Sequence, residues 1–534
     1  KSRINMNTSR NIINRVAMGD VFRRKAAISP NLDAIVEYRN NERIAYTHLT
    51  LNNALNKVDN MLRALNIKQG DRVALASPNS LEFALVIYGC MKAGVVVVPV
   101  NYLQGHADLV FTLNHCAAKA IFIEDSLTEK FEQCKDELSF LNHWISIPVT
   151  GCSVPSHHLC FNQLLETTSD KENEDLIIHD RDPLQILYTS GTTSKPKGVE
   201  TSHLALFINS LSAAIELGVK KESIGTSVMP MFHCAQHLIS TSVLHMNGTV
   251  HIFRNFEPES FAKIIAKEKI NFIFLLPLMW KALLEVPNIE KYDFSALETC
   301  MYAMAPIDKP SLLRLKAIFK CPFILGSGQT EMTPVTTVFQ DKWSYKDGNY
   351  WGEALVTTDQ AIMDDYGKIL PDGEIGEIVW RSPSAMNGYY KDPEATSEVS
   401  KFGWHHSGDL GYFDEDHQLM FVDRKKDMIK TGGENVPSVK VERVIMSHPG
   451  VAGVTVIGLP HPHWTEAVTA IVTPKIDVEI TEIEIINICK DELAGYEVPK
   501  RIIFVDDIAK TATGKFLKAP LREKYATLYI PVSH

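Results

Sequence analysis

Long hydrophobic runs are lacking in this chain of 534 residues. Its most apolar stretches, residues 81–100 and 270–280, are broken by polar side chains or are too short, whereas a membrane-spanning helix needs about 18 consecutive apolar residues. The segment from Lys1 to Met6 leads into no apolar core of the secretory-signal type. We therefore expect no transmembrane segment and a cytoplasmic location.

Cysteine pairs and an excess of positive charge are lacking as well. The nine cysteines are scattered, and none stands in the C-x-x-C spacing of many zinc and redox sites, so we interpret them as reduced thiols. The chain has 54 Lys and Arg against 64 Asp and Glu, which gives a net charge of −10. This balance does not favour nucleic acid as a partner.

Clusters of metal ligands are also scarce. His157 and His158 are adjacent, but no acidic residue or thiol stands near them at a spacing typical of zinc sites. A pair of histidines in a loop is ordinarily solvated. We therefore expect no metal ion at this pair.

What is present is the composition of an ordinary globular protein, with 45% hydrophobic and 22% charged residues. The length predicts roughly two to four domains. Strand signals at 95–100 and 118–123 alternate with helical periodicity at 51–65 and 80–92. This alternation is typical of α/β folds, with parallel sheets and ligands at the carboxyl ends of strands. Residues 150–182 are polar and irregular, and we expect a surface connection there.

One stretch, from Tyr188 to Val199, gathers hydroxyl side chains, glycines and lysines directly after the apolar run 184–187. Free backbone amides, hydroxyl donors and positive charge are what a polyphosphate needs. The spacing is not that of the kinase P-loop, because six residues separate Gly191 from Gly198. A solvated turn of the same composition is the alternative.

Residues 190–198, Ser-Gly-Thr-Thr-Ser-Lys-Pro-Lys-Gly, resemble the phosphate loop of the adenylate-forming superfamily, with Ser194 where that family usually has Gly. The superfamily comprises acyl-CoA synthetases, the adenylation domains of peptide synthetases, and luciferases. The resemblance implies that ATP phosphates are bound by Thr189, Ser190, Gly191, Thr192, Thr193, Lys195 and Lys197.

The segment 228–235 resembles the family's second motif, in which a histidine, here His233, gates the acid pocket. Adenylation domains for amino acids carry an Asp just after the aromatic residue, which here is Phe232. His233, Cys234 and Ala235 follow instead and offer no anion. A buried ammonium without a partner is costly, so an α-amino acid substrate is not expected.

The acyl pocket itself is implied by two further segments. Residues 270–280 resemble the segment that lines the pocket, although most of them are expected to be plain core, and Met279 and Trp280 are the pocket candidates, with core as the alternative. Ala303 and Met304 stand where the family commonly has paired glycines. The Met304 thioether is expected to shorten or redirect the acyl channel.

The segment 326–331, Gly-Ser-Gly-Gln-Thr-Glu, resembles the family's Tyr-Gly-x-Thr-Glu motif. The resemblance implies that Thr330 bonds the α-phosphate and that Glu331 holds Mg²⁺, a hard cation suited to carboxylate ligands. Ser327 takes the place of the aromatic residue that stacks on adenine, which weakens the expected hold on ATP. Nucleotide contacts are also implied for Gly326, Gln329, Asp409 and Arg424, the last two at the ribose.

The carboxyl-terminal part resembles the family's small mobile domain. Lys426 matches the hinge position, Gly432 and Gly433 match the loop that faces the site during thioester formation, and Lys515 matches the catalytic lysine of a Gly-Lys loop. We therefore expect an α/β fold with a large multi-subdomain N-terminal domain (1–423), parallel-type sheets, and a small α+β lid domain (424–534) with its hinge at 424–426.

Together the resemblance implies an acyl-CoA synthetase, an ATP-dependent acid–thiol ligase that uses ATP, Mg²⁺ and coenzyme A. The acid would be fatty or otherwise apolar, would form acyl-AMP with release of pyrophosphate, and would pass to CoA after rotation of the small domain. The alternatives are an acyl-AMP ligase that loads a separate carrier protein, a luciferase-like oxygenase, and a weak nucleotide-binding sensor, suggested by Ser194 and Ser327. A homodimer is also left open.

Overall fold

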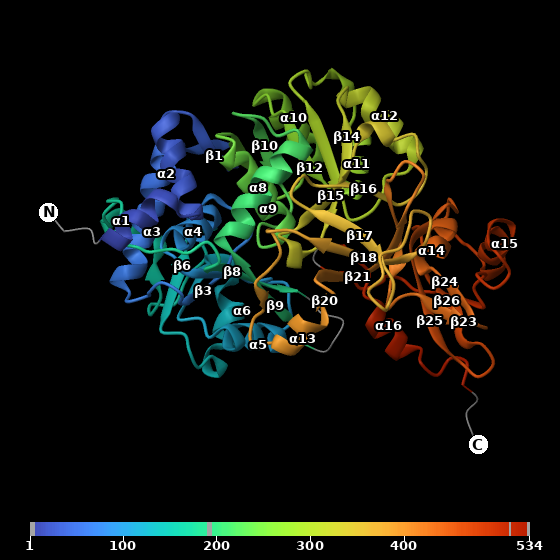
Figure 1. Ribbon diagram of the computed structural model, residues 1–534. Coiled ribbons are helices and arrows are strands. Elements are labelled where there is room, and N and C mark those ends of the chain that lie inside the picture. The colour runs from blue at the N-terminus through green and yellow to red at the C-terminus, as the bar shows by residue number, and fades with distance from the viewer. Residues whose placement is uncertain (1–5, 190–194, 512–513, 531–534) are drawn as a thin grey trace. The chain divides into compact units, whose positions relative to one another are not determined.

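The computed structural model describes residues 6–189, 195–511 and 514–530 (Figure 1). By its internal contacts the chain forms two compact units. The larger unit comprises residues 1–360 and 380–405, and the smaller unit comprises 361–379 and 406–534. The predicted boundary between 423 and 424 concerns the pivot of a motion, which this division by compactness does not test.

The first sheet of the larger unit contains the strand that leads into the predicted phosphate loop. Its strand order is β19-β9-β8-β4-β3-β5-β6-β7. Neighbours from β8 to β7 pair in parallel, whereas β8 pairs antiparallel with β9, and β9 with β19. The strands are β3 (Arg72–Ala76), β4 (Val96–Pro99), β5 (Ala120–Glu124), β6 (His143–Ile147), β7 (Leu159–Cys160), β8 (Pro183–Thr189), β9 (Lys197–Ser202) and β19 (Gly388–Tyr389).

Local sequence explains why this part folds as expected. Helix α4 (Leu81–Lys92) begins where the Ser80 hydroxyl accepts a hydrogen bond from the Phe83 amide, and the chain leaves it through Gly94, whose φ is +67°. Strand β4 follows as a run of β-branched valines that is buried on both faces. Helices α2 (Met18–Ile28) and α3 (His48–Ala64) pack against α4. The predicted α/β alternation is confirmed.

The second sheet of the larger unit brings the predicted binding segments together. Its strands run in the order β16-β15-β14-β13-β12-β10-β11-β1-β2, and those from β14 to β1 pair in parallel. They are β1 (Asp33–Arg39), β2 (Glu42–Thr47), β10 (Ile224–Ser227), β11 (Thr249–Ile252), β12 (Phe272–Leu275), β13 (Thr299–Ala303), β14 (Phe323–Gly328), β15 (Val335–Phe339) and β16 (Tyr350–Ala354).

The carboxyl ends of these parallel strands place the motifs at one edge. The acid motif follows β10, Ala303 ends β13, and the segment 326–331 continues from β14, with Ala303 and Gly326 as direct neighbours across the ladder. The helices between the strands include two long neighbours, α8 and α9, which Figure 1 shows side by side in green. They are α8 (His203–Leu217), α9 (Cys234–His245), α10 (Pro258–Lys267), α11 (Pro277–Leu284) and α12 (Lys309–Phe319).

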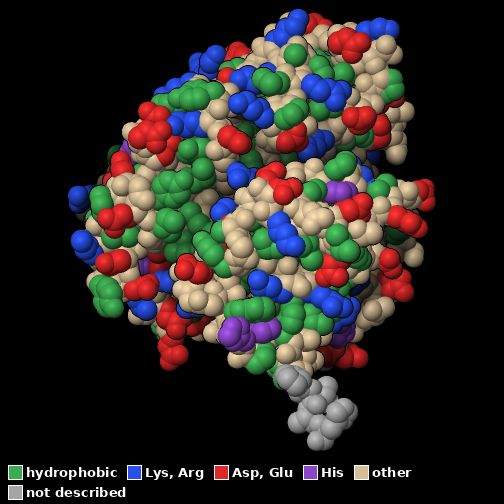
Figure 2. All heavy atoms as spheres, turned by 90° about the vertical axis from the view of Figure 1, so that its right-hand side faces the viewer, with side chains coloured by type: hydrophobic (Ala, Val, Ile, Leu, Met, Phe, Trp, Pro, Cys, Tyr) green, Lys and Arg blue, Asp and Glu red, His purple; other side chains and the backbone are tan. Residues whose placement is uncertain are grey.

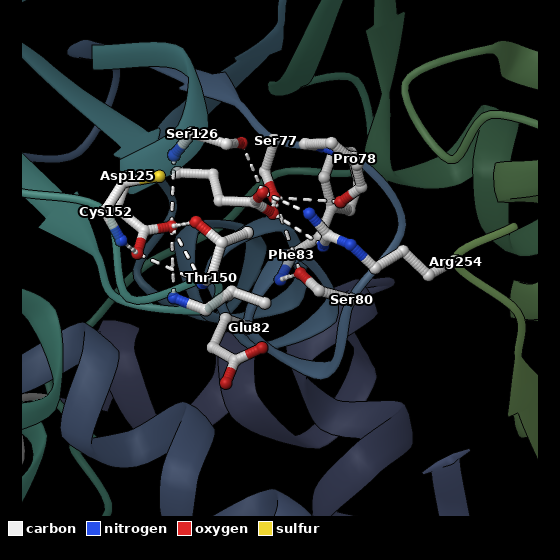
Figure 3. Close-up of polar contacts among 12 residues, drawn as sticks. Ser77, Pro78, Ser80, Glu82, Phe83, Asp125, Ser126, Thr150, Cys152 and Arg254 are labelled. Carbon is white, nitrogen blue, oxygen red and sulfur yellow. Dashed lines mark hydrogen bonds and ion pairs between the residues drawn. The ribbon is translucent and has the colours of Figure 1, made fainter. Parts of the chain in front are cut away.

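A buried ion pair joins the two sheets of the larger unit. Glu124 ends β5 in the first sheet and is fully buried, while Arg254 follows β11 of the second. The guanidinium binds both carboxylate oxygens, one of them at 2.8 Å, and the hydroxyls of Ser77 and Ser126 donate to the same carboxylate at 3.1 and 2.6 Å. Figure 3 shows Arg254 reaching toward these two serines. Every charge in the pair is therefore matched, as burial requires.

The smaller unit has the α+β character that its sequence predicts. A four-strand ladder β24-β23-β26-β25, with β27 beside β26, is accompanied by helices that carry its core residues. The elements are β21 (Trp404–Phe413), β22 (Leu419–Arg424), β23 (Ile429–Thr431), β24 (Glu434–Val436), α14 (Ser438–Met446), β25 (Val451–His461), β26 (Thr465–Pro474), α15 (Glu482–Glu492), β27 (Arg501–Phe504) and α16 (Lys518–Lys524).

The expectation of an irregular connection at 150–182 is only partly met. It contains β7, which pairs in parallel with β6, and helix α7 (Phe161–Thr167). Phe161 is fully buried and packs edge-on against Phe122, with ring centroids 5.7 Å apart. A segment with so few apolar residues carries no readable period, which is why the sequence did not predict these elements.

The remaining elements and the surface add little to the positioning of the site. The elements are α1 (Met6–Asn14), α5 (His106–Cys116), α6 (Thr128–Glu132), α13 (Pro393–Glu398), β17 (Asp359–Met363), β18 (Gly376–Arg381) and β20 (Ser400–Lys401).

In the part of the chain that the structure describes, no helix combines the length and apolar composition needed to cross a bilayer. On the face shown in Figure 2, acidic and basic side chains are interspersed, so neither sign dominates there.

Candidate active site

The Thr330 and Glu331 side chains are presented by a tight turn directly after β14. A side-chain carbon at Gly328 would lie 1.3 Å from the Pro334 carbonyl oxygen, so only glycine allows this close approach of two backbone segments. The chain then forms a short 3-10 turn from Thr330 to Met332. The small residue therefore fixes where the two predicted catalytic side chains point.

Glu331 is held by a residue that the sequence did not single out. The Tyr389 hydroxyl donates a hydrogen bond of 2.8 Å to Glu331 Oε1, and Tyr389 lies opposite Val199 in the β19–β9 ladder. Burial, and then the Glu331 charge, raise the pKa of Tyr389 well above its usual range, so this hydroxyl remains a donor. A carboxylate oriented in this way is the kind of oxygen ligand that Mg²⁺ prefers.

The same tyrosine contacts the phosphate-loop region. The Lys197 ammonium lies 4.9 Å from the centre of the Tyr389 ring, a distance at which a cation is attracted to an aromatic face. Lys197 itself pairs with Thr189 across the β8–β9 ladder. Tyr389 thus contacts both a predicted phosphate-binding lysine and the predicted metal ligand. Because Tyr389 and Glu331 are 58 residues apart, no short sequence motif could have revealed this contact.

The loop itself falls partly outside the described residues, which exclude the predicted contacts Ser190, Gly191, Thr192 and Thr193. Its flanks are described. Lys195 is exposed, with its ammonium 5.4 Å from the Phe111 ring centre, and Thr189 ends β8. These positions are compatible with the predicted roles and do not test them.

The acid motif reaches the Thr330 turn. Cys234 Sγ lies 3.2 Å from Thr330 Oγ1, and His233, immediately before it, is the N-cap of α9, with Nδ1 accepting from the Ala235 amide. His233 is half-buried. The structure therefore brings the predicted acid-pocket histidine and the predicted α-phosphate ligand to the same end of the sheet.

Two amide side chains that the sequence analysis missed hold this motif in place. Asn79 donates to the Met229 carbonyl at 2.9 Å and accepts from the Met231 amide at 2.8 Å. Gln236 Oε1 accepts from the Val228 and Met229 amides, both at 3.0 Å. Both side chains are buried. Because a buried amide has to satisfy its polar atoms, these contacts fix the loop that carries His233.

The four acyl-pocket candidates lie in different environments. Ala303 is buried beside Gly326, and Met304 is 40% exposed with a φ of +76°. Met279 is half-buried, whereas Trp280 is fully buried, donates its Nε1 proton to the Met301 carbonyl at 3.1 Å, and packs against Phe319 and Phe323. Trp280 is thus a core residue in this structure, and the pocket roles stay predictions.

The adenine segment continues this arrangement. Ser327 is half-buried in β14, where its carbonyl accepts from the Thr336 hydroxyl. Gln329 Oε1 lies 3.4 Å from His405 Nε2. The Met301 methyl group would lie 2.3 Å from a side-chain carbon at Gly326. The Met301 side chain therefore occupies the space that a side chain at position 326 would need.

The smaller unit holds the predicted ribose ligands as a pair. Asp409 and Arg424 are opposite each other in the β21–β22 ladder, with Nε and Oδ1 3.8 Å apart. Asp409 is only 6% exposed. The Ser407 hydroxyl accepts from the Asp409 amide and donates to the Ile378 carbonyl, which fixes the turn that presents the carboxylate.

The remaining predicted residues lie elsewhere in the smaller unit. Lys426 is in the turn at 425–427. Gly432 and Gly433, with φ of +59° and +89°, connect β23 to β24, and an open cleft of about 570 Å³ beside them is lined by Trp464, Tyr496 and Lys500, among others. Lys515 is exposed, and its amide donates to the Thr511 hydroxyl at 3.1 Å.

Comparisons with known proteins agree with this geometry. The family model for AMP-binding enzymes matches residues 22–390, and the model for the C-terminal domain of AMP-binding enzymes matches residues 440–515. The chain is 31% identical to a feruloyl-CoA synthase of Amycolatopsis over 506 residues, 94% of this chain and 98% of that protein.

A second relative and a solved structure extend the match over the whole described fold. The chain is 32% identical over 514 residues to the long-chain-fatty-acid–CoA ligase FadD13 of Mycobacterium tuberculosis, covering 95% of this chain and 98% of that protein. ATP-bound MatB from Rhodopseudomonas palustris superposes with a TM-score of 0.85 at 25% identity, covering 96% of this chain and 99% of that one. The chain therefore belongs to the AMP-binding enzyme family, as its phosphate-loop, Thr330–Glu331 and Gly-Lys segments predict.

Proposed function

We propose that the protein is an ATP-dependent acid–thiol ligase that converts a carboxylic acid to acyl-AMP and then to a CoA thioester. The observation that carries the proposal is the meeting of three motifs in the larger unit: Cys234 of the acid motif at Thr330, and Lys197 and Glu331 on the two sides of Tyr389. Relatives named as a feruloyl-CoA synthase and a long-chain-fatty-acid–CoA ligase support this reaction class.

The first step would form one bond and break one bond. An oxygen of the acid attacks the α-phosphorus of ATP, the bond from that phosphorus to the bridging oxygen breaks, and pyrophosphate leaves. Thr330 would donate to the α-phosphate and Lys515 would bridge it to the carboxylate, which is stabilisation by positioned charge rather than covalent chemistry. Glu331, oriented by Tyr389, would hold Mg²⁺, which neutralises phosphate charge.

The second step would transfer the acyl group. The thiol sulfur of CoA attacks the acyl carbon, the carbon–oxygen bond to AMP breaks, and AMP leaves while the thiol proton is lost. We infer that the small domain, residues 424–534, rotates about Lys426 between the steps, so that the Gly432–Gly433 loop replaces Lys515 at the site. Use of one site for two reactions by domain movement is well precedented.

The substrate proposed is an apolar acid. His233, Cys234 and Ala235 offer no carboxylate to a substrate ammonium. Ala303, which is the ladder neighbour of Gly326, and Met304 both have apolar side chains. We also propose that the protein works in the cytoplasm, because its nine cysteines lack the paired spacing of disulfide frameworks and zinc sites, as is usual for reduced thiols in a reducing compartment. The homodimer hypothesis is tested by light scattering on the purified chain.

The experiment is pyrophosphate release with Mg·ATP across short, medium, long-chain and aromatic acids, each with and without CoA. Turnover that depends on CoA supports the acyl-CoA ligase and identifies its acid class. Release that is indifferent to CoA would favour the carrier-loading ligase. Light emission would favour the oxygenase. The absence of pyrophosphate release with every acid tested would favour the sensor.

The role of Lys515 has its own test. Lys515→Ala is expected to abolish pyrophosphate release, since the bridging cation is lost, and yet to spare thioester formation from supplied acyl-AMP. Lys510→Ala, which changes a lysine whose ammonium lies 5.2 Å from the Phe516 ring centre, is the matched control. An equal fall of both half-reactions in Lys515→Ala would contradict the assigned role.

A further inference from the structure

Three side chains with metal-ligating atoms converge beside the β6–β7 edge of the first sheet, apart from the proposed site. Glu132 ends helix α6, and His157 and His158 form the turn that leads into β7. Both histidines direct Nε2 at the same Glu132 oxygen, Oε1, at 3.2 and 2.9 Å. The three ligand atoms all lie within 4.8 Å of one another.

This arrangement corrects the expectation that the histidine pair is merely solvated. Glu132 stands 25 residues before His157, so the acidic partner is invisible to a search for ligands at short spacing. The His158 side chain is 0% exposed. A fully buried imidazole facing a carboxylate is a built feature of the fold, not a surface residue.

His158 is held in the way that metal-binding histidines are usually held. Its second ring nitrogen, Nδ1, lies 2.7 Å from the hydroxyl of Ser146, a buried residue of β6. The Trp144 ring, from the same face of β6, stacks on His158 with centroids 5.5 Å apart. A partner on the far nitrogen fixes the tautomer and aims the near nitrogen at the metal.

We propose that Glu132, His157 and His158 form a binding site for a divalent transition-metal ion, with Zn²⁺ as the probe. Zinc bonds of about 2.0–2.2 Å in tetrahedral geometry place ligand atoms roughly 3.3–3.6 Å apart. The Glu132 oxygen lies 3.2 and 2.9 Å from the two imidazole nitrogens, and all three ligand atoms lie within 4.8 Å of one another, so small shifts suffice to admit the ion. Two imidazoles and one carboxylate suit zinc and its neighbours, whereas Mg²⁺ prefers oxygen ligands alone. The fourth position is left for water.

A lysine competes with the metal for this site. The Lys135 ammonium lies 2.7 Å from His157 Nε2 and 3.9 Å from Glu132 Oε2, so it supplies the positive charge that the carboxylate and the imidazole attract. Its side chain is 40% exposed, which allows it to turn into solvent when a dication enters. Lys135 should therefore weaken metal binding without being needed for the fold.

Metal binding would stabilise the outer edge of the first sheet. Strand β7 is short and, among the described strands, lies at the end of the ladder beside β6. A metal held by Glu132 of α6 and by the turn before β7 would fasten this edge to a helix. Because a metal that binds only the folded state raises stability by mass action, the melting temperature is a readout independent of enzymatic activity.

The experiment is isothermal titration of the full chain with Zn²⁺, in excess Mg²⁺ so that oxygen-only sites are filled. One Zn²⁺ per chain is expected to bind. Glu132→Gln should weaken binding at least tenfold, Ser146→Ala about 10–100-fold as for other partners of ligating histidines, and Lys135→Met should strengthen it several-fold. His179→Ala, which changes an exposed histidine of the same unit, should leave it unchanged.

Two further readouts keep the result decisive. Co²⁺ in place of Zn²⁺ should give the visible absorption of a tetrahedral nitrogen–oxygen site, and Zn²⁺ should raise the melting temperature of the wild type but not of Glu132→Gln. Metal-free melting shows that each variant is folded. Zn²⁺ affinity that is the same in wild type, Glu132→Gln and Lys135→Met would overturn the proposal and leave a hydrogen-bonded triad without a metal function.

Discussion

Tyr389 is the residue whose replacement tests the proposed metal ligand most directly. Its hydroxyl donates to Glu331 Oε1 at 2.8 Å, while the ring lies under the Lys197 ammonium. Tyr389→Phe removes the hydroxyl and keeps the ring, so the lysine contact and the packing survive. The change thus frees one oxygen of Glu331 and alters little else.

The expected effect of Tyr389→Phe on Mg²⁺ binding can be worked out from the energy of the lost hydrogen bond. A bond to a charged group contributes about 1.5–3 kcal/mol, and because both partners are half-buried the lower end of that range applies. About 1.4 kcal/mol corresponds to a factor of ten. The Mg²⁺ concentration for half-maximal activity should therefore rise about tenfold, while the rate at saturating Mg²⁺ changes little, since Tyr389 orients Glu331 and is not itself placed at the reacting atoms.

The assay is pyrophosphate release at fixed ATP and acid over a range of Mg²⁺ concentrations. Tyr390→Phe is the matched control, because that neighbouring ring packs edge-on against His115, with centroids 5.6 Å apart, and contributes no hydrogen bond to Glu331 in this structure. A Mg²⁺ dependence that is equal in both variants and the wild type would refute the positioning role. A large fall in the rate at saturating Mg²⁺ would place Tyr389 in the chemistry instead.

Three other predictions concern the nucleotide, the fold and pH. Ser327→Tyr should lower the KM for ATP about tenfold, since stacking on a base contributes about 1–3 kcal/mol, and an ATP titration of pyrophosphate release measures it. Glu124→Gln should lower the free energy of unfolding by about 3 kcal/mol, because Arg254 loses the charge that matches it, and denaturant unfolding with Glu129→Gln as an exposed control measures it. Burial lowers the pKa of His203 to about 4, below the unfolded value of about 6.5. At His203 the unfolded chain thus binds more protons between these values, and the contribution of this residue to stability should fall by up to about 1.4 kcal/mol per pH unit as the pH drops from 6 to 5. Other buried histidines with lowered pKa values, such as His237 and His251, add to the slope of the whole protein. His203→Asn, whose Oδ1 can accept from the Met18 amide in place of Nδ1, should reduce the slope by that amount, and a slope equal to that of the wild type would contradict the reasoning.

The parts of the fold that sequence could predict are those where local signals agree. The Ser80 cap, the helical run to Lys92 and the valines of β4 each indicate the element that forms. The family motifs could be located because each is a short contiguous segment, such as Gly326 to Glu331, which spans the end of β14. Contiguity preserves the geometry of such a loop, which is why sequence alone locates it.

The residues that sequence could not identify act across long separations. Asn79 bonds the loop of Met229 from 150 residues away, and Tyr389 reaches Glu331 across 58. Their side chains are an ordinary amide and an ordinary phenol, and only the topology of the sheets brings them to their partners. Glu132 and the histidine pair belong to the same class, and for that reason the sequence analysis rejected the metal interpretation.

The compact units and the proposed pivot divide the chain differently for a physical reason. The boundary between the two compact units falls between residues 405 and 406. Both residues belong to the continuous strand β21 (Trp404–Phe413). A paired strand is a poor pivot, because rotation inside it would break ladder hydrogen bonds to its neighbour. The proposed pivot at Lys426 instead lies in the turn between β22 and β23.

A buried hydrogen bond spans that turn and would have to break during the proposed rotation. The Asp423 carboxylate, just before the turn, accepts a hydrogen bond of 2.7 Å from the hydroxyl of Ser438, which begins α14 after it. Asp423 is buried, so breaking this contact inside the protein costs more than breaking it in water. Rotation about Lys426 therefore requires that Asp423 be hydrated or find a new donor. We therefore expect the Asp423–Ser438 hydrogen bond to set part of the energy barrier to the proposed rotation.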